Sequence, residues 1–117
     1  MWKTLLVPHD FSPPADRALR LAADLAKLHG GSIALLHVCE LPENVSADTV
    51  VEPAGVRIRV DEYAMRGASR QLEALAAPIR HEGIPVRILA LTGDAFRGIL
   101  EATDALGAVG PVMQRIA

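Results

Sequence analysis

The segment Ser32–Cys39 constrains the fold of this chain most strongly, because it is apolar at almost every position. A strand with one face in water alternates apolar and polar side chains, whereas Ile33, Ala34, Leu35 and Leu36 follow one another without a break. Such a run is typical of a strand covered on both faces. It therefore predicts a parallel sheet with helices packed against it.

A helix is predicted directly before this strand, over Pro13–His29. Ser12 is a favourable N-cap, Pro13 suits the first helical position, and Gly30 provides the stop. The apolar stripe of this helix recurs at helical spacing and consists of Ala15, Ala18, Leu19, Ala22, Leu25 and Ala26. These signals predict an amphipathic helix that packs on the sheet.

The turn before this helix is the first candidate for a binding site. A short apolar run ends in Pro8, His9, Asp10 and Phe11, and the helix cap follows at once. A buried strand that leads into a helix N-terminus brings polar groups and free amides to the carboxyl edge of a sheet. Ligands of α/β proteins bind at that edge.

The second half of the chain continues the same pattern. Residues 40–55 are predicted to form a loop, and a helix is predicted over residues 57–82, with a kink or an early break at Pro78. A third strand is predicted over residues 85–91, and Asp94 can cap a third helix. The order β-α-β-α-β-α indicates an α/β fold with short right-handed connections.

Composition limits the function classes. With 117 residues we expect a single domain, 1–117, and a net charge of −2 argues against a nucleic-acid partner. The arginines of the second predicted helix are interpreted as a solvated face. No secretory signal and no apolar run of about 18 residues is present, so we expect a cytoplasmic chain with no membrane partner.

The sequence offers little support for metal or enzyme chemistry. Cys39 is the only cysteine and is interpreted as a small buried hydrophobe, and the four histidines show no metal-ligand spacing. A P-loop, a Gly-x-Gly-x-x-Gly fingerprint and a nucleophile elbow are missing. We therefore predict no metal site, no catalytic residues and, at most, a slow ATPase.

Three motifs in a fixed order resemble the universal stress protein family. They are Leu-Val-Pro-His-Asp-Phe-Ser at residues 6–12, Ala-Leu-Leu-His-Val at residues 34–38 and Leu-Thr-Gly-Asp-Ala at residues 91–95. The resemblance covers residues 3–107. It implies a doubly wound parallel sheet with helices on both faces, of the adenine-nucleotide alpha hydrolase type, and a site for ATP or AMP at the carboxyl ends of the strands.

The resemblance also implies a set of nucleotide-binding residues. It places Pro8, His9, Asp10 and Phe11 in the turn after the first strand, where the aspartate typically meets the ribose. The backbone of Val38 would contact adenine. A carboxylate accepts hydrogen bonds from ribose hydroxyls, and a free backbone edge can read a base, so these roles are chemically reasonable. His9 is interpreted as a turn residue rather than a base.

The end of the chain departs from the family. Relatives that bind ATP carry a fourth strand and a phosphate loop of the form Gly-x-x-Gly, a spacer and Gly-Ser, and this segment is missing here. The last residues resemble the Gly-Ser-Val opening of the final helix, which makes Gly110 and Val112 the remaining candidates for nucleotide contacts. Either the chain is short, with about three or four strands, or an internal stretch has been left out of it.

Two functions follow from the resemblance. The first is a small stress-response regulator that binds ATP or AMP, with Mg²⁺ as the accompanying ion, and signals through an oligomer interface. The alternative is an association module that has lost nucleotide binding and acts through the 40–55 loop and an exposed sheet edge. In a truncated sheet the first strand would be an edge open to pairing, so we expect a homodimer.

Overall fold

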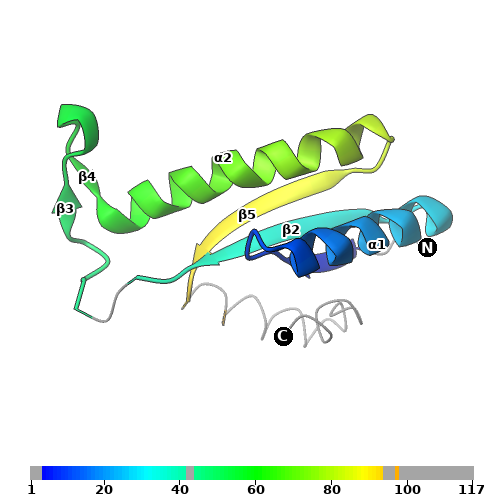
Figure 1. Ribbon diagram of the computed structural model, residues 1–117, viewed down its shortest axis with the longest axis horizontal. Helices are drawn as coiled ribbons and strands as arrows, with labels where there is room; N and C mark the ends of the chain where they lie inside the picture. Colours follow the sequence, from blue (N-terminus) through cyan, green and yellow to red (C-terminus); the bar gives the residue numbers. More distant parts are fainter. Residues whose placement is uncertain (1–3, 42–43, 94–96, 98–117) are drawn as a thin grey trace.

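The computed structural model describes residues 4–41, 44–93 and 97. Figure 1 shows how the helices and strands are arranged around a central parallel sheet. In chain order they are β1 (Thr4–Pro8), α1 (Pro13–His29), β2 (Ser32–Cys39), β3 (Val50–Val51), η1 (Pro53–Gly55), β4 (Ile58–Arg59), α2 (Val60–His81) and β5 (Val86–Thr92). The third helix predicted after Asp94 lies outside the described residues.

The predicted parallel sheet is confirmed. The strand order is β1-β2-β5, and β2 pairs in parallel with both neighbours. Leu6 is level with Ala34 on β2, and Leu35 is level with Ile88 on β5. The continuous apolar run is therefore the central strand, with a strand on each flank. Its side chains are buried on both faces of the sheet, because Ile33 and Leu35 belong to the main core and Ala34 and Leu36 to a smaller cluster on the opposite face.

The boundaries of α1 agree with the prediction to the residue. Ser12 adopts an extended backbone, and its hydroxyl oxygen accepts a hydrogen bond from the Ala15 amide at 3.4 Å. Gly30 ends the helix in the left-handed conformation, with φ of 68°. At the surface, Arg20 ties α1 to the end of α2 through two hydrogen bonds to the Glu82 carboxylate, at 2.8 and 2.9 Å.

The second helix differs from its prediction at both ends. It begins at Val60 rather than residue 57, because Ile58 and Arg59 pair with β3 in a short hairpin. Of the kink or early break predicted at Pro78, the early break is wrong, since α2 runs through this proline to His81. Ile79 is buried in the core beyond the proline, and the Arg80 guanidinium donates to the Val86 carbonyl, so tertiary contacts hold the last turn.

The predicted loop contains a projecting arm, defined here as residues 46–59. Its β3–β4 hairpin extends beyond the N-terminal end of α2, away from the sheet (Figure 1). The arm is attached to α2 by the Val60 amide, which donates to the Thr49 carbonyl at 2.7 Å. Val50 and Val56 are 49% and 60% exposed, so the hairpin presents apolar side chains to the surroundings.

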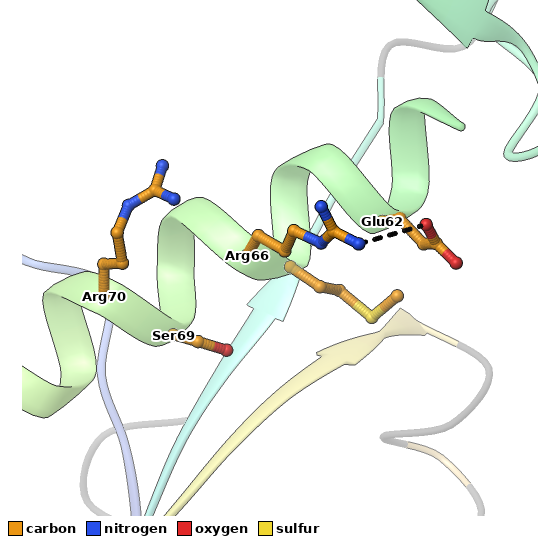
Figure 2. Close-up of a pocket in the computed structure, with 5 residues that line it drawn as sticks. Glu62, Arg66, Ser69 and Arg70 are labelled. Atoms are coloured by element: carbon orange, nitrogen blue, oxygen red, sulfur yellow. Dashed lines mark ion pairs between the residues drawn. The ribbon is translucent and has the colours of Figure 1, made fainter. Parts of the chain in front are cut away.

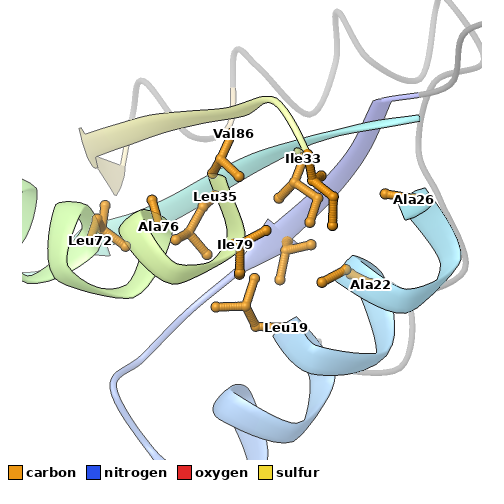
Figure 3. Close-up of a cluster of buried hydrophobic side chains, with 12 residues drawn as sticks. Leu19, Ala22, Ala26, Ile33, Leu35, Leu72, Ala76, Ile79 and Val86 are labelled. Atoms are coloured by element: carbon orange, nitrogen blue, oxygen red, sulfur yellow. The ribbon is translucent and has the colours of Figure 1, made fainter. Parts of the chain in front are cut away.

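The main core lies between the sheet and both described helices (Figure 3). Because the steps from β1 to β2 and from β2 to β5 run in the same direction, crossovers of one hand place α1 and α2 on the same face. The buried cluster comprises Val7, Leu19, Ala22, Ala23, Ala26, Ile33, Leu35, Leu72, Ala76, Ile79, Ile84 and Val86. This arrangement leaves the carboxyl ends of the strands at one end of the core.

The opposite face of the sheet carries a smaller apolar cluster of Leu6, Ala34 and Leu36. Among the described residues, both α-helices pack on the other face, in the main core. The observed part is therefore an α/β fold with a parallel sheet of three strands and two helices on one face. Within the described part of the chain, no helix is long and apolar enough to cross a membrane.

Candidate functional site

The buried side chain of His9 stabilises the turn between β1 and α1. The His9 amide donates to the Leu36 carbonyl at 2.7 Å. The ring nitrogen Nδ1 accepts from the Phe11 amide at 2.9 Å, so Nε2 carries the proton and donates to Asp16 Oδ1, also at 2.9 Å. Every polar group of this histidine is thus used to shape the turn.

Phe11 adopts a backbone conformation that is rare for a residue with a side chain, with φ of 63°. Its ring packs near two imidazoles, at centroid distances of 5.4 Å from His9 and 4.6 Å from His37. His37 Nδ1 donates to the His9 carbonyl at 2.7 Å, which joins β2 to the turn. The ring contacts with both histidines and the hydrogen bond from the Phe11 amide to His9 stabilise the unusual backbone.

Asp10 is the exposed member of the turn. Its Oδ1 accepts hydrogen bonds from the Ser12 hydroxyl and from the Ser12 amide, the latter at 3.1 Å. The hydrogen bond from the Ser12 hydroxyl, followed by that from the Ser12 amide, holds the pKa of the Asp10 carboxyl below its ordinary value. Both bonds reach the same oxygen, so the second oxygen of the exposed, ionised carboxylate has the capacity to accept further hydrogen bonds.

This shift predicts a pH-dependent difference between the wild type and Asp10→Asn. A carboxyl whose pKa is lowered by folding stabilises the fold above its unfolded pKa, and this stabilisation is lost as pH falls through the folded pKa. We expect Asp10→Asn to be less stable than the wild type at neutral pH and equal to it in acid, at a pH below the folded pKa of Asp10. Urea unfolding over this range measures the difference, and a gap that persists at low pH would contradict the assignment.

The backbone of Val38 faces the same turn. On β2, the Leu36 carbonyl accepts from the His9 amide on the β1 side, while the Ile33 amide donates to Pro85 on the β5 side. Because backbone groups of a strand alternate between its two flanks, those of Val38 point to the β1 side, like those of Leu36. However, β1 ends level with Leu36. No β1 residue pairs with Val38, so its N–H and C=O lie beyond the end of β1, at the end of the strand where the turn begins.

A cavity of about 360 Å³ opens between the turn, the end of β2 and α2. Phe11, His37 and Cys39 form one side, and Tyr63 and Gln71 of α2 contribute to the other. Burial raises the pKa of the Cys39 thiol, so the cysteine is protonated at neutral pH. Tyr63 was not singled out from the sequence. The only signal for it is that it is an aromatic residue near the start of α2.

A second hollow, shown in Figure 2, lies on the outer surface of α2. It is lined by Glu62, Met65, Arg66, Ser69 and Arg70, all of which belong to this one helix. Arg66 forms an exposed ion pair with Glu62 at 3.9 Å (Figure 2). The open shape and the exposed charges agree with the solvated face expected from the sequence, so we do not place the site here.

The structure thus brings four of the residues predicted for the site into one turn, namely Pro8, His9, Asp10 and Phe11, with the end of β2 beside them. Gly110 and Val112 lie outside the described residues. Among the residues described, no three His, Cys, Asp or Glu side chains are grouped so that they could hold a metal ion.

Comparison with known proteins identifies the family. The model of the universal stress protein family matches residues 1–109. A structure of a universal stress protein family member from Burkholderia pseudomallei is similar, with a TM-score of 0.62 and 19% identity over 97% of this chain and 86% of that one. A universal stress protein from Archaeoglobus fulgidus has a TM-score of 0.54 and 25% identity over 97% of this chain and 36% of that one. No curated protein matches significantly. The family model spans the turn, the sheet and both helices, and the chain therefore belongs to the universal stress protein family.

Proposed function

We propose that this protein binds an adenine nucleotide, ATP or AMP, at the carboxyl edge of its parallel sheet. The observation that carries the proposal is the exposed Asp10 carboxylate, which hydrogen bonds hold in the ionised form in the turn after β1, where no described strand pairs with the β1 side of Val38. Family membership adds weight, because many universal stress proteins bind ATP. We place this activity in the cytosol.

Each part of the nucleotide has a chemically suitable group nearby. Ribose hydroxyls can donate to the free oxygen of Asp10, and the N–H and C=O of Val38 can pair with the donor and acceptor edge of adenine. The candidates for the phosphate contacts are Gly110 and Val112, with Mg²⁺ offsetting the phosphate charge. Asp10 and Val38 can therefore recognise the nucleoside part of the ligand.

Replacing Asp10 by Ala is expected to weaken the binding of AMP roughly tenfold, because a hydrogen bond between a hydroxyl and a carboxylate is lost. Isothermal titration calorimetry with ATP and AMP measures the effect. Asp24→Ala is the matched control, since Asp24 is an exposed aspartate on α1 that pairs with Arg20 at 2.9 Å. Equal affinities for the two variants would count against a ligand contact at Asp10.

Association without nucleotide is the second candidate function, and the arm is the observation that favours it. Val50 and Val56 are exposed on a hairpin that projects from the fold, and an isolated two-stranded hairpin has little stability of its own. A homodimer that buries the arm would stabilise it. Light scattering after size-exclusion chromatography, with and without ATP, separates a constitutive dimer from a nucleotide-dependent one and from a monomer.

A further inference from the structure

The outer edge of β5 is an unpaired flank of the described sheet. In the order β1-β2-β5, β5 has a strand on one side only. The Pro85 carbonyl faces β2, where it accepts from the Ile33 amide, and backbone groups of a strand alternate between its two flanks. Those of Ile88 and Ala90 therefore point away from β2, and among the described residues they have no strand partner there. Such groups are a template for another strand.

Arg80 closes the beginning of this edge. Its guanidinium donates from Nε and Nη2 to the Val86 carbonyl, at 3.1 and 2.8 Å. The rest of β5 lacks the proline or multiple charges that protect many edge strands, since Arg87 is its one charged residue. The other edge strand of the described sheet, β1, is shorter and ends in Pro8, which has no amide to donate. We call residues Ile88–Ala90 the open edge.

The side chains of the open edge are incompletely covered on both faces of the sheet. Ile88 and Ala90 pack against the main core, and Leu89 packs against the smaller cluster on the opposite face. All three are only partly buried, whereas Leu35 and Leu36 of the central strand are completely buried. An added strand would complete this burial if it carried apolar residues at consecutive positions.

β5 itself has that pattern, and its open edge is complementary to a second copy of itself. In an antiparallel pair with a twofold axis at Leu89, Ile88 of one copy lies opposite Ala90 of the other. Each such pair exchanges both of its hydrogen bonds, so the outward groups of the open edge satisfy one another. A register shifted by two residues would instead place Ala90 opposite Val86, whose carbonyl Arg80 already occupies.

The helix beside β5 adds charge complementarity. α2 runs along β5 (Figure 1), and Arg80 near its end contacts Val86 near the start of the strand, so the two elements are antiparallel. Leu89 is about 10 Å further along β5, which corresponds to about seven residues back along α2 and places the axis close to Glu73. Arg70 and Glu73 are exposed, and Arg70 forms no ion pair with any described residue. Two α2 helices side by side bring Arg70 of one copy near Glu73 of the other.

We propose that the open edge of β5 binds a second copy of this chain, so that the two sheets become continuous across a twofold axis at Leu89. The sequence favoured the first strand as the dimer edge, whereas the free backbone groups and the register favour β5. The inference does not depend on nucleotide binding, because this flank is separate from the turn that contains Asp10. It is also separate from the arm, which gives the test a matched control.

Proline at position 90 tests the open edge. The Ala90 amide points outward, so Ala90→Pro removes a donor from the proposed interface and none from the pairing with β2. Light scattering after size-exclusion chromatography is expected to show a dimer for the wild type and a monomer for Ala90→Pro. Val50→Pro removes an outward amide from the arm instead and is expected to stay dimeric. A monomeric wild type, or a dimer that Val50→Pro breaks and Ala90→Pro keeps, would overturn the proposal.

Hydrogen exchange in the wild type tests the interface without any variant. The amides of Arg87 and Leu89 bond to β2 and are expected to be protected at every protein concentration. Those of Ile88 and Ala90 are expected to exchange rapidly in dilute protein and roughly tenfold more slowly once the dimer forms. A dimer in which these two amides still exchange freely would overturn the proposal.

Charge reversal on α2 tests the antiparallel arrangement. Arg70→Glu places like charges together at Glu73 and is expected to raise the dissociation constant of the dimer about tenfold. Arg17→Glu makes the same change at an exposed position of α1 and is the control. Equal dissociation constants for the two variants would contradict the placement of α2 at the axis and with it the proposed register.

Discussion

Replacing Leu72 by Ala is expected to lower the free energy of unfolding by about 2–5 kcal/mol, the range for leucine truncations in protein cores. Leu72 is completely buried where α2 packs on the sheet, in the same cluster as Leu35 and Ala76 (Figure 3). The smaller side chain removes apolar contacts and leaves a cavity that neighbouring strands cannot fill, because their backbones are held in the sheet.

Urea unfolding followed by circular dichroism measures this loss, and Leu28→Ala is the matched control. Leu28 lies on α1 with 75% of its surface exposed, so the same truncation there is expected to change stability by no more than about 0.5 kcal/mol. A small effect at Leu72, similar to that at Leu28, would mean that α2 does not pack on the sheet as described.

His9→Ala is expected to lower the free energy of unfolding by about 2 kcal/mol and to weaken the proposed nucleotide binding. Truncation leaves the Phe11 amide without its acceptor at Nδ1 and removes the bond from Nε2 to Asp16. Phe11 also loses one of the two rings that hold its left-handed backbone. The turn that presents Asp10 would then sample other conformations, and the entropy of ordering it would reduce affinity.

Two further variants separate the roles of His9. In His9→Asn the carboxamide oxygen can take the place of Nδ1 as acceptor for the Phe11 amide, so we expect partial recovery of stability relative to His9→Ala. His29→Ala changes an exposed histidine at the end of α1 and serves as the control. Equal losses in His9→Asn and His9→Ala would show that the hydrogen bond to Phe11 contributes little.

Local signals account for the parts of the fold that the sequence predicted well. The cap at Ser12, the proline at residue 13 and the left-handed Gly30 each act within a few residues of the helix end, so α1 was predicted with its observed boundaries. The apolar run of β2 likewise predicted a strand buried on both faces. In both cases the residues that carry the signal also form the element.

Predictions that depended on distant partners were less accurate. The start of α2 shifted because Ile58 and Arg59 pair with β3, and the break expected at Pro78 is absent because Ile79 and Arg80 make tertiary contacts. A helix propensity cannot register such contacts, since they involve residues from other elements. Tertiary packing overrode the local signal at both ends of this helix.

The sequence by itself therefore determined the order of β1, α1, β2, α2 and β5, the caps of α1 and the polar turn that contains Asp10. Only the tertiary structure decided that both described helices cover one face of the sheet, that β1 ends before it reaches Val38, and that Tyr63 shares a cavity with Phe11 and His37. The physical reason is that caps and apolar periodicity act between near neighbours, whereas a site is made where strand register and helix packing bring distant residues together.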